Sequence, residues 1–160
     1  MEGKRVEIVR WEWYQKLIEE YNQKFGTSIK ITRKMTNKME KYRFRRSDVE
    51  STLYLIERYK KPVSWIIRWK VEYGYTFEEI DKILETAEYL GCQVYTVRKL
   101  LDVCDRDLYL FDRLIDYILT NGVYNDTEIL KFARYLETNY SSIEEFFAWL
   151  DYKEEWIEEE

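Results

Sequence analysis

The chain has 160 residues, of which 46% are hydrophobic and 36% are charged, and its net charge is −5. It contains no histidine and two cysteines, which excludes histidine-based catalysis and a metal site of four thiolates. No phosphate-binding loop or metalloprotease motif is present either, so we expect a non-enzymatic protein without catalytic residues, metal or other cofactors.

The cysteines and the apolar segments indicate where the protein resides. Cys92 and Cys104 fall at apolar positions of one predicted helical region, so two buried thiols are favoured over a disulfide, in keeping with a reducing cytoplasm. No segment approaches the ~20 apolar residues of a membrane span, and the charged N-terminus lacks the apolar core of a signal peptide. We therefore expect a cytoplasmic protein without membrane contact.

Helical periodicity and helix-start signals follow one another along the chain. Apolar residues at helical spacing predict a helix over residues 6–25, which Gly26 ends. A capping box of Ser47 and Glu50 is expected to open a helix that runs to about Lys60. Further helices are expected over 63–73, 76–90 (opened by a capping box of Thr76 and Glu79), 93–103, 106–120 (opened by Asp105), 127–138 and 143–157. This pattern predicts an all-α fold, a compact bundle of about seven or eight helices.

The basic segment, residues 27–46, has the least helical pattern. Its beginning is compatible with extended backbone, and the rest with a short amphipathic helix or an arm. The segment contains eight basic side chains against one acid, Glu40, with Tyr42 and Phe44 interleaved. This pattern favours contact with phosphates, through counterion release and stacking on bases, or with an acidic partner. A solvated face paired with the acidic C-terminal helix is the alternative. The side chains expected to neutralise DNA phosphates are Arg33, Lys34, Lys38, Lys41, Arg43, Arg45 and Arg46.

The run from Thr86 to Leu101, TAEYLGCQVYTVRKLL, has the spacing of two short helices that cross at a tight turn. Ala87 is small enough for the crossing, and Gly91 tolerates the left-handed backbone of the turn. In these residues the chain resembles the helix-turn-helix family of DNA-binding regulators. The resemblance implies a unit over residues 76–103 whose second helix enters the DNA major groove. The side chains that it places toward DNA are Gln93, Tyr95, Thr96, Arg98 and Lys99. A helical hairpin that turns without contacting DNA is the alternative.

Charge is unevenly distributed over the single domain expected across residues 1–160. Residues 1–80 contain 18 basic and 12 acidic side chains, a net charge of +6, whereas residues 81–160 contain 8 and 19, a net charge of −11. The acidic C-terminal helix, residues 143–160, is expected to dock through its aromatic side chains and to expose its carboxylates. Imitation of DNA phosphates, or masking of the basic segment, are the alternative roles of these carboxylates.

These features together predict a non-enzymatic regulator that binds double-stranded DNA and controls transcription in a virus, plasmid or prokaryote. The rival hypothesis is a small acidic helical protein that binds and inhibits a nucleic-acid-handling complex, as a DNA mimic or an anti-defence factor. Six tryptophans and 15 tyrosines exceed what one small core buries. We expect the surplus at a homodimer interface or at an interface with a protein partner.

Overall fold

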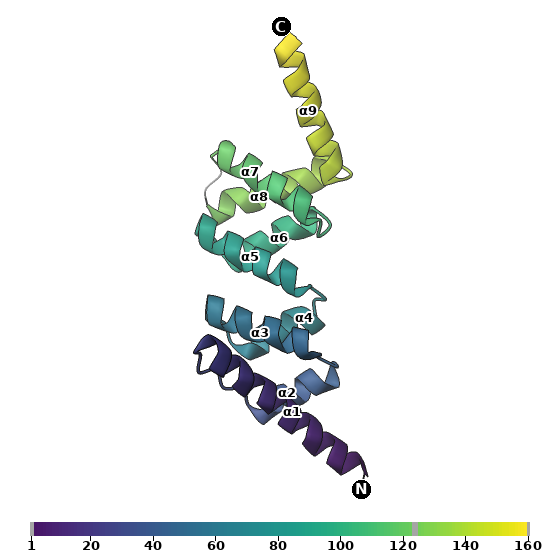
Figure 1. The fold of residues 1–160 in the computed structure, drawn as a ribbon. Helices are drawn as coiled ribbons and strands as arrows, with labels where there is room; N and C mark the ends of the chain where they lie inside the picture. The colour runs from purple at the N-terminus through teal and green to yellow at the C-terminus, as the bar shows by residue number, and fades with distance from the viewer. Residues whose placement is uncertain (1, 123–124, 160) are drawn as a thin grey trace. The chain divides into compact units, whose positions relative to one another are not determined.

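Secondary structure in the described part of the chain is helical. The computed structural model describes residues 2–122 and 125–159, and every regular element in them is an α-helix, as Figure 1 shows. The helices are α1 (Glu2–Phe25), α2 (Arg33–Lys41), α3 (Arg46–Tyr59), α4 (Val63–Val71), α5 (Phe77–Leu90), α6 (Val94–Val103), α7 (Leu108–Thr120), α8 (Asp126–Asn139) and α9 (Ile143–Glu159). The all-α prediction is confirmed, with nine helices in the described residues in place of seven or eight. Among these residues, no helix is both long and apolar enough to cross a membrane.

Several helix ends lie where local signals predict them. α1 ends at Phe25, and Gly26 follows with a φ of +64°, a backbone conformation that glycine adopts without strain. The predicted capping box at the start of α5 is present. The Glu79 N–H donates to Thr76 Oγ1 at 3.0 Å, and the Thr76 N–H donates to Glu79 Oε1 at 2.9 Å. Both signals act within a few residues, so a sequence pattern is sufficient to locate them.

The start of α3 differs from the predicted one. Ser47 and Glu50 do not cap the helix, because α3 begins at Arg46 and its N-cap residue is Arg45. The Arg45 backbone N–H donates to the Asp48 carboxylate at 2.8 Å. Asp48, three residues after the N-cap, therefore has the role that the sequence assigns to Glu50.

The start of α7 also differs from the predicted one. The sequence predicts Asp105 as the cap, whereas α7 begins at Leu108 and Asp107 is its N-cap. Asp105 and Arg106 have φ values of 53° and 61°, and the Arg106 N–H donates to Leu101 O at 3.0 Å. This left-handed turn closes α6, so α7 begins only after it.

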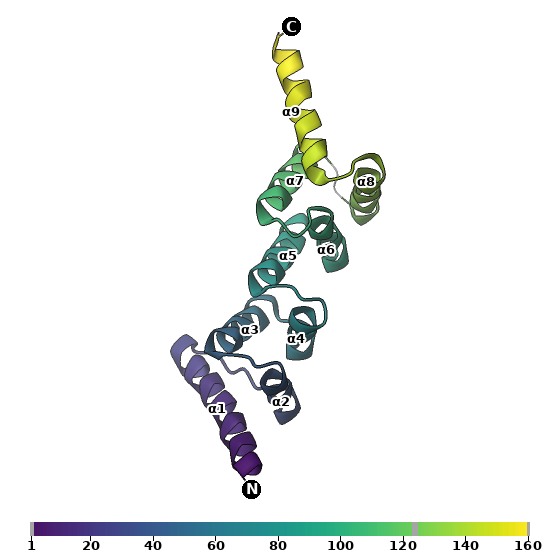
Figure 2. The same ribbon diagram turned by 90° about the vertical axis from the view of Figure 1, so that its right-hand side faces the viewer.

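The chain packs as two compact units, Met1–Asp81 and Lys82–Glu160, where the sequence predicts one domain. In the first unit α1 packs against α2 and α3, while α4 packs against α2 and α3. Figure 2 shows α1 and α3 in one layer of this unit and α2 and α4 in the other. In the second unit α6 packs against α7 and α8. Helical hairpins are thus the building blocks of both units.

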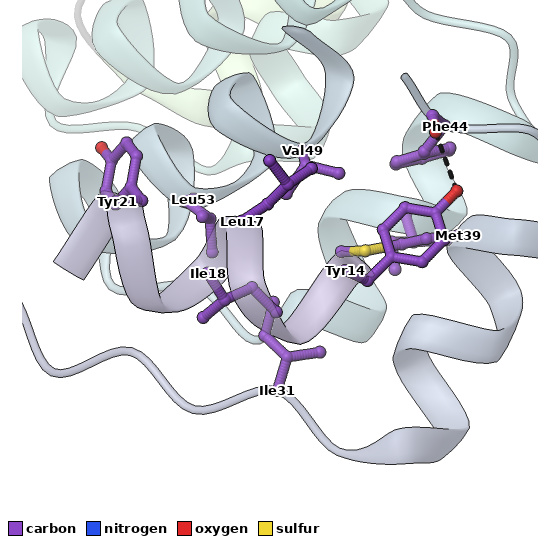
Figure 3. Packing of buried hydrophobic residues seen from close by; sticks show 10 residues of the cluster. Tyr14, Leu17, Ile18, Tyr21, Ile31, Met39, Phe44, Val49 and Leu53 are labelled. Atoms are coloured by element: carbon purple, nitrogen blue, oxygen red, sulfur yellow. Dashed lines mark hydrogen bonds between the residues drawn. The ribbon is translucent and has the colours of Figure 1, made fainter. Parts of the chain in front are cut away.

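The core of the first unit includes the segment between α1 and α2 (Figure 3). Its buried side chains are Tyr14, Leu17, Ile18, Tyr21, Ile31, Met39, Phe44, Val49, Leu53 and Ile67. The Tyr14 hydroxyl donates to Phe44 O at 2.8 Å, and burial raises the pKa of Tyr14, which keeps this donor protonated. The Asn22 side chain bonds both the backbone N–H and the carbonyl of Ile29, at 3.0 and 2.9 Å. The basic segment is therefore an ordered extended stretch held on α1, followed by the short helix α2.

The second unit buries the beginning of α9 in an aromatic cluster. Phe146 and Phe147 are buried, whereas Trp149 is 45% and Tyr152 is 66% exposed. Figures 1 and 2 both show α9 extending away from α7 and α8 beyond this point. The expected docking of the acidic helix thus applies to its beginning, as far as Asp151, whose carboxylate accepts from Arg113 of α7 at 2.5 Å. The last predicted residue of the helix, Glu160, lies outside the described residues.

Candidate nucleic-acid interface

α2 separates a buried face from an exposed basic face. Thr36 and Met39 are 1% and 0% exposed and lie on the core side of the helix. The helix begins behind Thr32, whose hydroxyl accepts a long hydrogen bond from the Met35 N–H at 3.4 Å. The basic side chains of α2 are all exposed: Arg33, Lys34, Lys38 and Lys41. Core packing therefore fixes which way the charges of this helix point.

A left-handed residue after α2 keeps three more cations in solvent. Arg43 has a φ of 58°, and the Phe44 N–H donates to Met39 O at 2.8 Å. The reversal brings Phe44 into the core, while Arg43, Arg45 and Arg46 stay exposed. All seven side chains that the sequence predicts to neutralise phosphates are therefore on the protein surface.

Ion pairs within the described residues involve only one of these seven cations. Arg46 Nη2 lies 3.6 Å from Glu20 Oε2, and Arg46 Nη1 lies 3.9 Å from Glu50 Oε1. Glu40, the acid inside the segment, lies 3.7 Å from Arg10. The remaining six cations define the α2 basic surface: Arg33, Lys34, Lys38, Lys41, Arg43 and Arg45. In the part of the chain that the structure describes, these six cations form no ion pair.

Two cations of the α2 basic surface lie over aromatic rings. The Arg33 guanidinium carbon is 5.1 Å from the centroid of the Trp11 ring, and Lys41 Nζ is 5.6 Å from that of Tyr42. Such contacts are worth about 0.5–1 kcal/mol at exposed sites and leave the positive charge in place. Tyr42 itself is 45% exposed. The surface therefore combines oriented cations with an accessible ring.

The second candidate element, α5 with α6, has the predicted helix boundaries and turn. Gly91 has a φ of +67°, and the Cys92 N–H donates to Ala87 O at 3.1 Å. The apolar framework is buried: Ala87, Val97, Leu100 and Leu101 are at most 6% exposed. Two helices joined by the predicted turn are therefore present at this place in the sequence.

α8 covers part of the face of α6 that the sequence predicts to contact DNA. Thr96 is 1% exposed, and its hydroxyl donates to Asp126 Oδ1 at 2.5 Å. Lys99 Nζ lies 2.7 Å from Glu137 Oε1 on α8. The prediction that Thr96 points outward is wrong, because α8 packs along this side of α6. The other members of the predicted set are more accessible: Gln93 and Tyr95 are exposed, and Arg98 is partly exposed.

Asp126, the first residue of α8, stabilises the beginning of α6. Its Oδ1 accepts from the Gln93 N–H at 2.9 Å as well as from Thr96. We expect Asp126→Ala to lower the free energy of unfolding of the second unit by about 1.5–3 kcal/mol, because Thr96 loses a charged acceptor while buried. Urea denaturation measures this loss. The control is Asp112→Ala, which removes an exposed ion pair with Lys82 and should cost less than about 1 kcal/mol. Equal losses in the two variants would contradict the role of Asp126.

The stabilisation by Asp126 should also depend on pH. Hydrogen bonds from the Thr96 hydroxyl and then the Gln93 N–H hold the pKa of Asp126 below its usual value. A carboxylate with a lowered folded-state pKa stabilises the fold above its unfolded pKa, and this contribution is lost as the pH falls through the folded value. The difference between wild type and Asp126→Ala should therefore be full at neutral pH and shrink below about pH 4.

Both cysteines are free thiols, as expected. Cys104 is buried and Cys92 is partly buried. Burial raises the pKa of Cys104 to about 12 and that of Cys92 to about 11, with a smaller contribution from neighbouring carboxylates. Because the thiolate is the reactive form, neither side chain has the properties of a nucleophile near neutral pH.

Comparison with known proteins finds no match among family models, curated proteins or solved structures. The chemistry of the α2 basic surface is therefore the basis for assigning a function.

Proposed function

We propose that this chain is a non-enzymatic DNA-binding protein that contacts DNA phosphates with the α2 basic surface. The main observation behind the proposal is a group of six exposed cations on one helix and the turn after it. Within the described residues none of the six forms an ion pair. Each phosphate that such a cation neutralises releases a condensed counterion, which drives binding at low salt.

The spacing of the cations on α2 suits a row of phosphates. Lys34, Lys38 and Lys41 are at positions i, i+4 and i+7 of the helix and therefore lie along one face. At 1.5 Å per residue this row is about 10 Å long, and DNA presents several phosphates over such a length of its helix axis. The three amino groups can thus contact neighbouring phosphates.

The α2 basic surface is also ordered before DNA arrives. Met39 and Thr36 hold α2 in the core, and the turn at Arg43 is closed by the hydrogen bond of Phe44. Binding therefore costs little backbone entropy, unlike binding by a disordered basic tail. A protein of this kind acts as a regulator by occupying DNA. Tyr95 on α6 and Gln93, the N-cap residue of α6, are further side chains that remain exposed for such contacts.

A salt series with a labelled DNA duplex tests the proposal by fluorescence anisotropy. We expect affinity to fall steeply with salt. In the variant Lys34→Gln/Lys38→Gln/Lys41→Gln, the slope of log affinity against log salt should drop by about 3 and the affinity by roughly 10- to 100-fold. The matched control removes three exposed cations elsewhere, in Lys131→Gln/Arg134→Gln/Lys153→Gln. No binding at low salt, or the same loss in the control, would contradict the proposal.

The second candidate function is inhibition of a nucleic-acid-handling protein through the acidic second unit. Beyond Phe147, α9 exposes Trp149 and Tyr152 on the same helix as the exposed Glu154, whereas the Asp151 carboxylate is paired with Arg113 of α7. Aromatic rings beside carboxylates suit a basic protein surface. This function is tested by adding the chain to a purified nuclease or polymerase, whose activity should fall with the wild-type chain and recover with Trp149→Ala/Tyr152→Ala.

A further inference from the structure

A small groove lies between α2 and α4, beside the α2 basic surface. Its volume is about 270 Å³, and both helices contribute to its lining, with Lys38 and Tyr42 from the α2 side and Trp65 and Arg68 from α4. The two helices belong to the same layer of the first unit, as Figure 2 shows. The volume is just below the roughly 300–1,000 Å³ of pockets for drug-sized ligands. The α2–α4 groove is therefore of a size for one planar ring system.

Positive charge predominates around the α2–α4 groove. Lys38 and Arg68 line the groove. Trp65 also lines it, and Lys61 Nζ lies 5.5 Å from the centroid of the Trp65 ring. The acid in the lining is Glu72, whose Oε2 lies 3.7 Å from Arg68 Nε in an exposed pair. Exposed pairs of this spacing contribute little to stability, so a phosphate can compete for the guanidinium.

The groove is also lined by the exposed aromatic ring of Tyr42, which is not part of the core. Tyr42 is the C-cap residue of α2 and is 45% exposed, whereas Phe44, two residues on, is buried. Trp65 forms part of the opposite wall and is stacked on Trp69, with the ring centroids 4.2 Å apart. An aromatic face next to cations is the arrangement that binds unpaired bases, because every base has a π-face to stack.

We propose that the α2–α4 groove binds one unpaired base of single-stranded DNA, stacked on Tyr42, with the flanking phosphates on Lys38 and Arg68. This inference rests on the proposed DNA binding and names its preferred substrate. In a duplex both faces of each base are already stacked on neighbouring bases, so no base is available to enter the groove. Phosphate contacts alone favour the duplex, which carries the higher charge density. Tighter binding of a single strand therefore reports on the groove.

The experiment compares a labelled thymine strand of about 12 nucleotides, within the size range of single-strand sites, with a duplex of the same length, by anisotropy at one salt concentration. We expect the single strand to bind more tightly to the intact chain. Tyr42→Leu should weaken single-strand binding roughly 5- to 100-fold, the loss of one stacking contact, and change duplex binding less than about twofold. Tyr42→Phe keeps the ring and should bind like wild type.

Tyr54→Leu is the matched control, because Tyr54 is 47% exposed on α3, away from this groove. The inference is overturned if the duplex binds as tightly as the single strand, or if Tyr42→Leu has no larger effect than Tyr54→Leu. A uracil RNA strand that bound more tightly than the thymine strand would overturn the assignment to DNA. In each of these cases a steep salt dependence of duplex binding would leave the proposed function standing, whereas absence of DNA binding would remove both.

Discussion

Replacing Phe146 with alanine is expected to lower the free energy of unfolding of the second unit by about 3–5 kcal/mol. Phe146 is 2% exposed at the docked end of α9. Five aromatic rings lie around it with centroid distances of 5.2 to 6.5 Å, those of Tyr117, Phe132, Tyr140, Phe147 and Trp149. The substitution leaves a cavity between rings from three helices, and rigid rings fill such a space poorly. The loss should therefore fall in the upper part of the range for core substitutions.

Urea denaturation and hydrogen exchange measure the effect of Phe146→Ala. Protection should fall in residues 82–122 and 125–154, which belong to the same compact unit. Tyr152→Ala is the control on the same helix, and because Tyr152 is 66% exposed it should change stability by less than about 0.5 kcal/mol. A loss below about 1 kcal/mol for Phe146→Ala would show that α9 is not anchored by this ring.

Met39→Ala is expected to destabilise the first unit by about 2–5 kcal/mol and to weaken DNA binding without removing a charge. Met39 is 0% exposed on the inner face of α2 and lies beside Tyr14 and Phe44 in Figure 3. Because α2 has nine residues, it is too short to be stable as an isolated helix in water. Loss of its buried anchor should therefore disorder the α2 basic surface as well as the core.

Denaturation and DNA anisotropy on the same samples test this coupling between core and surface. Met39→Leu conserves volume and should cost less than about 1.5 kcal/mol, with DNA affinity near that of wild type. Met35→Ala on the same helix is a second control, since Met35 is only partly buried. If Met39→Ala lost stability but bound DNA as tightly as wild type, then the order of α2 would be irrelevant to binding.

Local signals in the sequence were sufficient for most helices and for the concentration of cations in residues 27–46, but not for choosing between a short helix and an arm there. Gly26 and Gly91 end helices because they adopt positive φ, and the box of Thr76 and Glu79 starts one through bonds over three residues. The same signals failed at Asp105, because the cap of α7 is Asp107, two residues further on. There the choice depends on the left-handed turn that closes α6, and no glycine marks it.

Only the tertiary structure decided which side chains of the candidate sites remain exposed. Thr96 flanks the apolar face of α6 and is buried because Asp126, 30 positions further along the chain, lies over it on α8. Tyr42 and Phe44 are equivalent in the sequence pattern, yet the reversal at Arg43 buries the second and exposes the first. Amphipathic periodicity determines which face of a helix is apolar. How many side chains beside that face are also buried depends on which other helix packs against it. That helix comes from a distant part of the sequence.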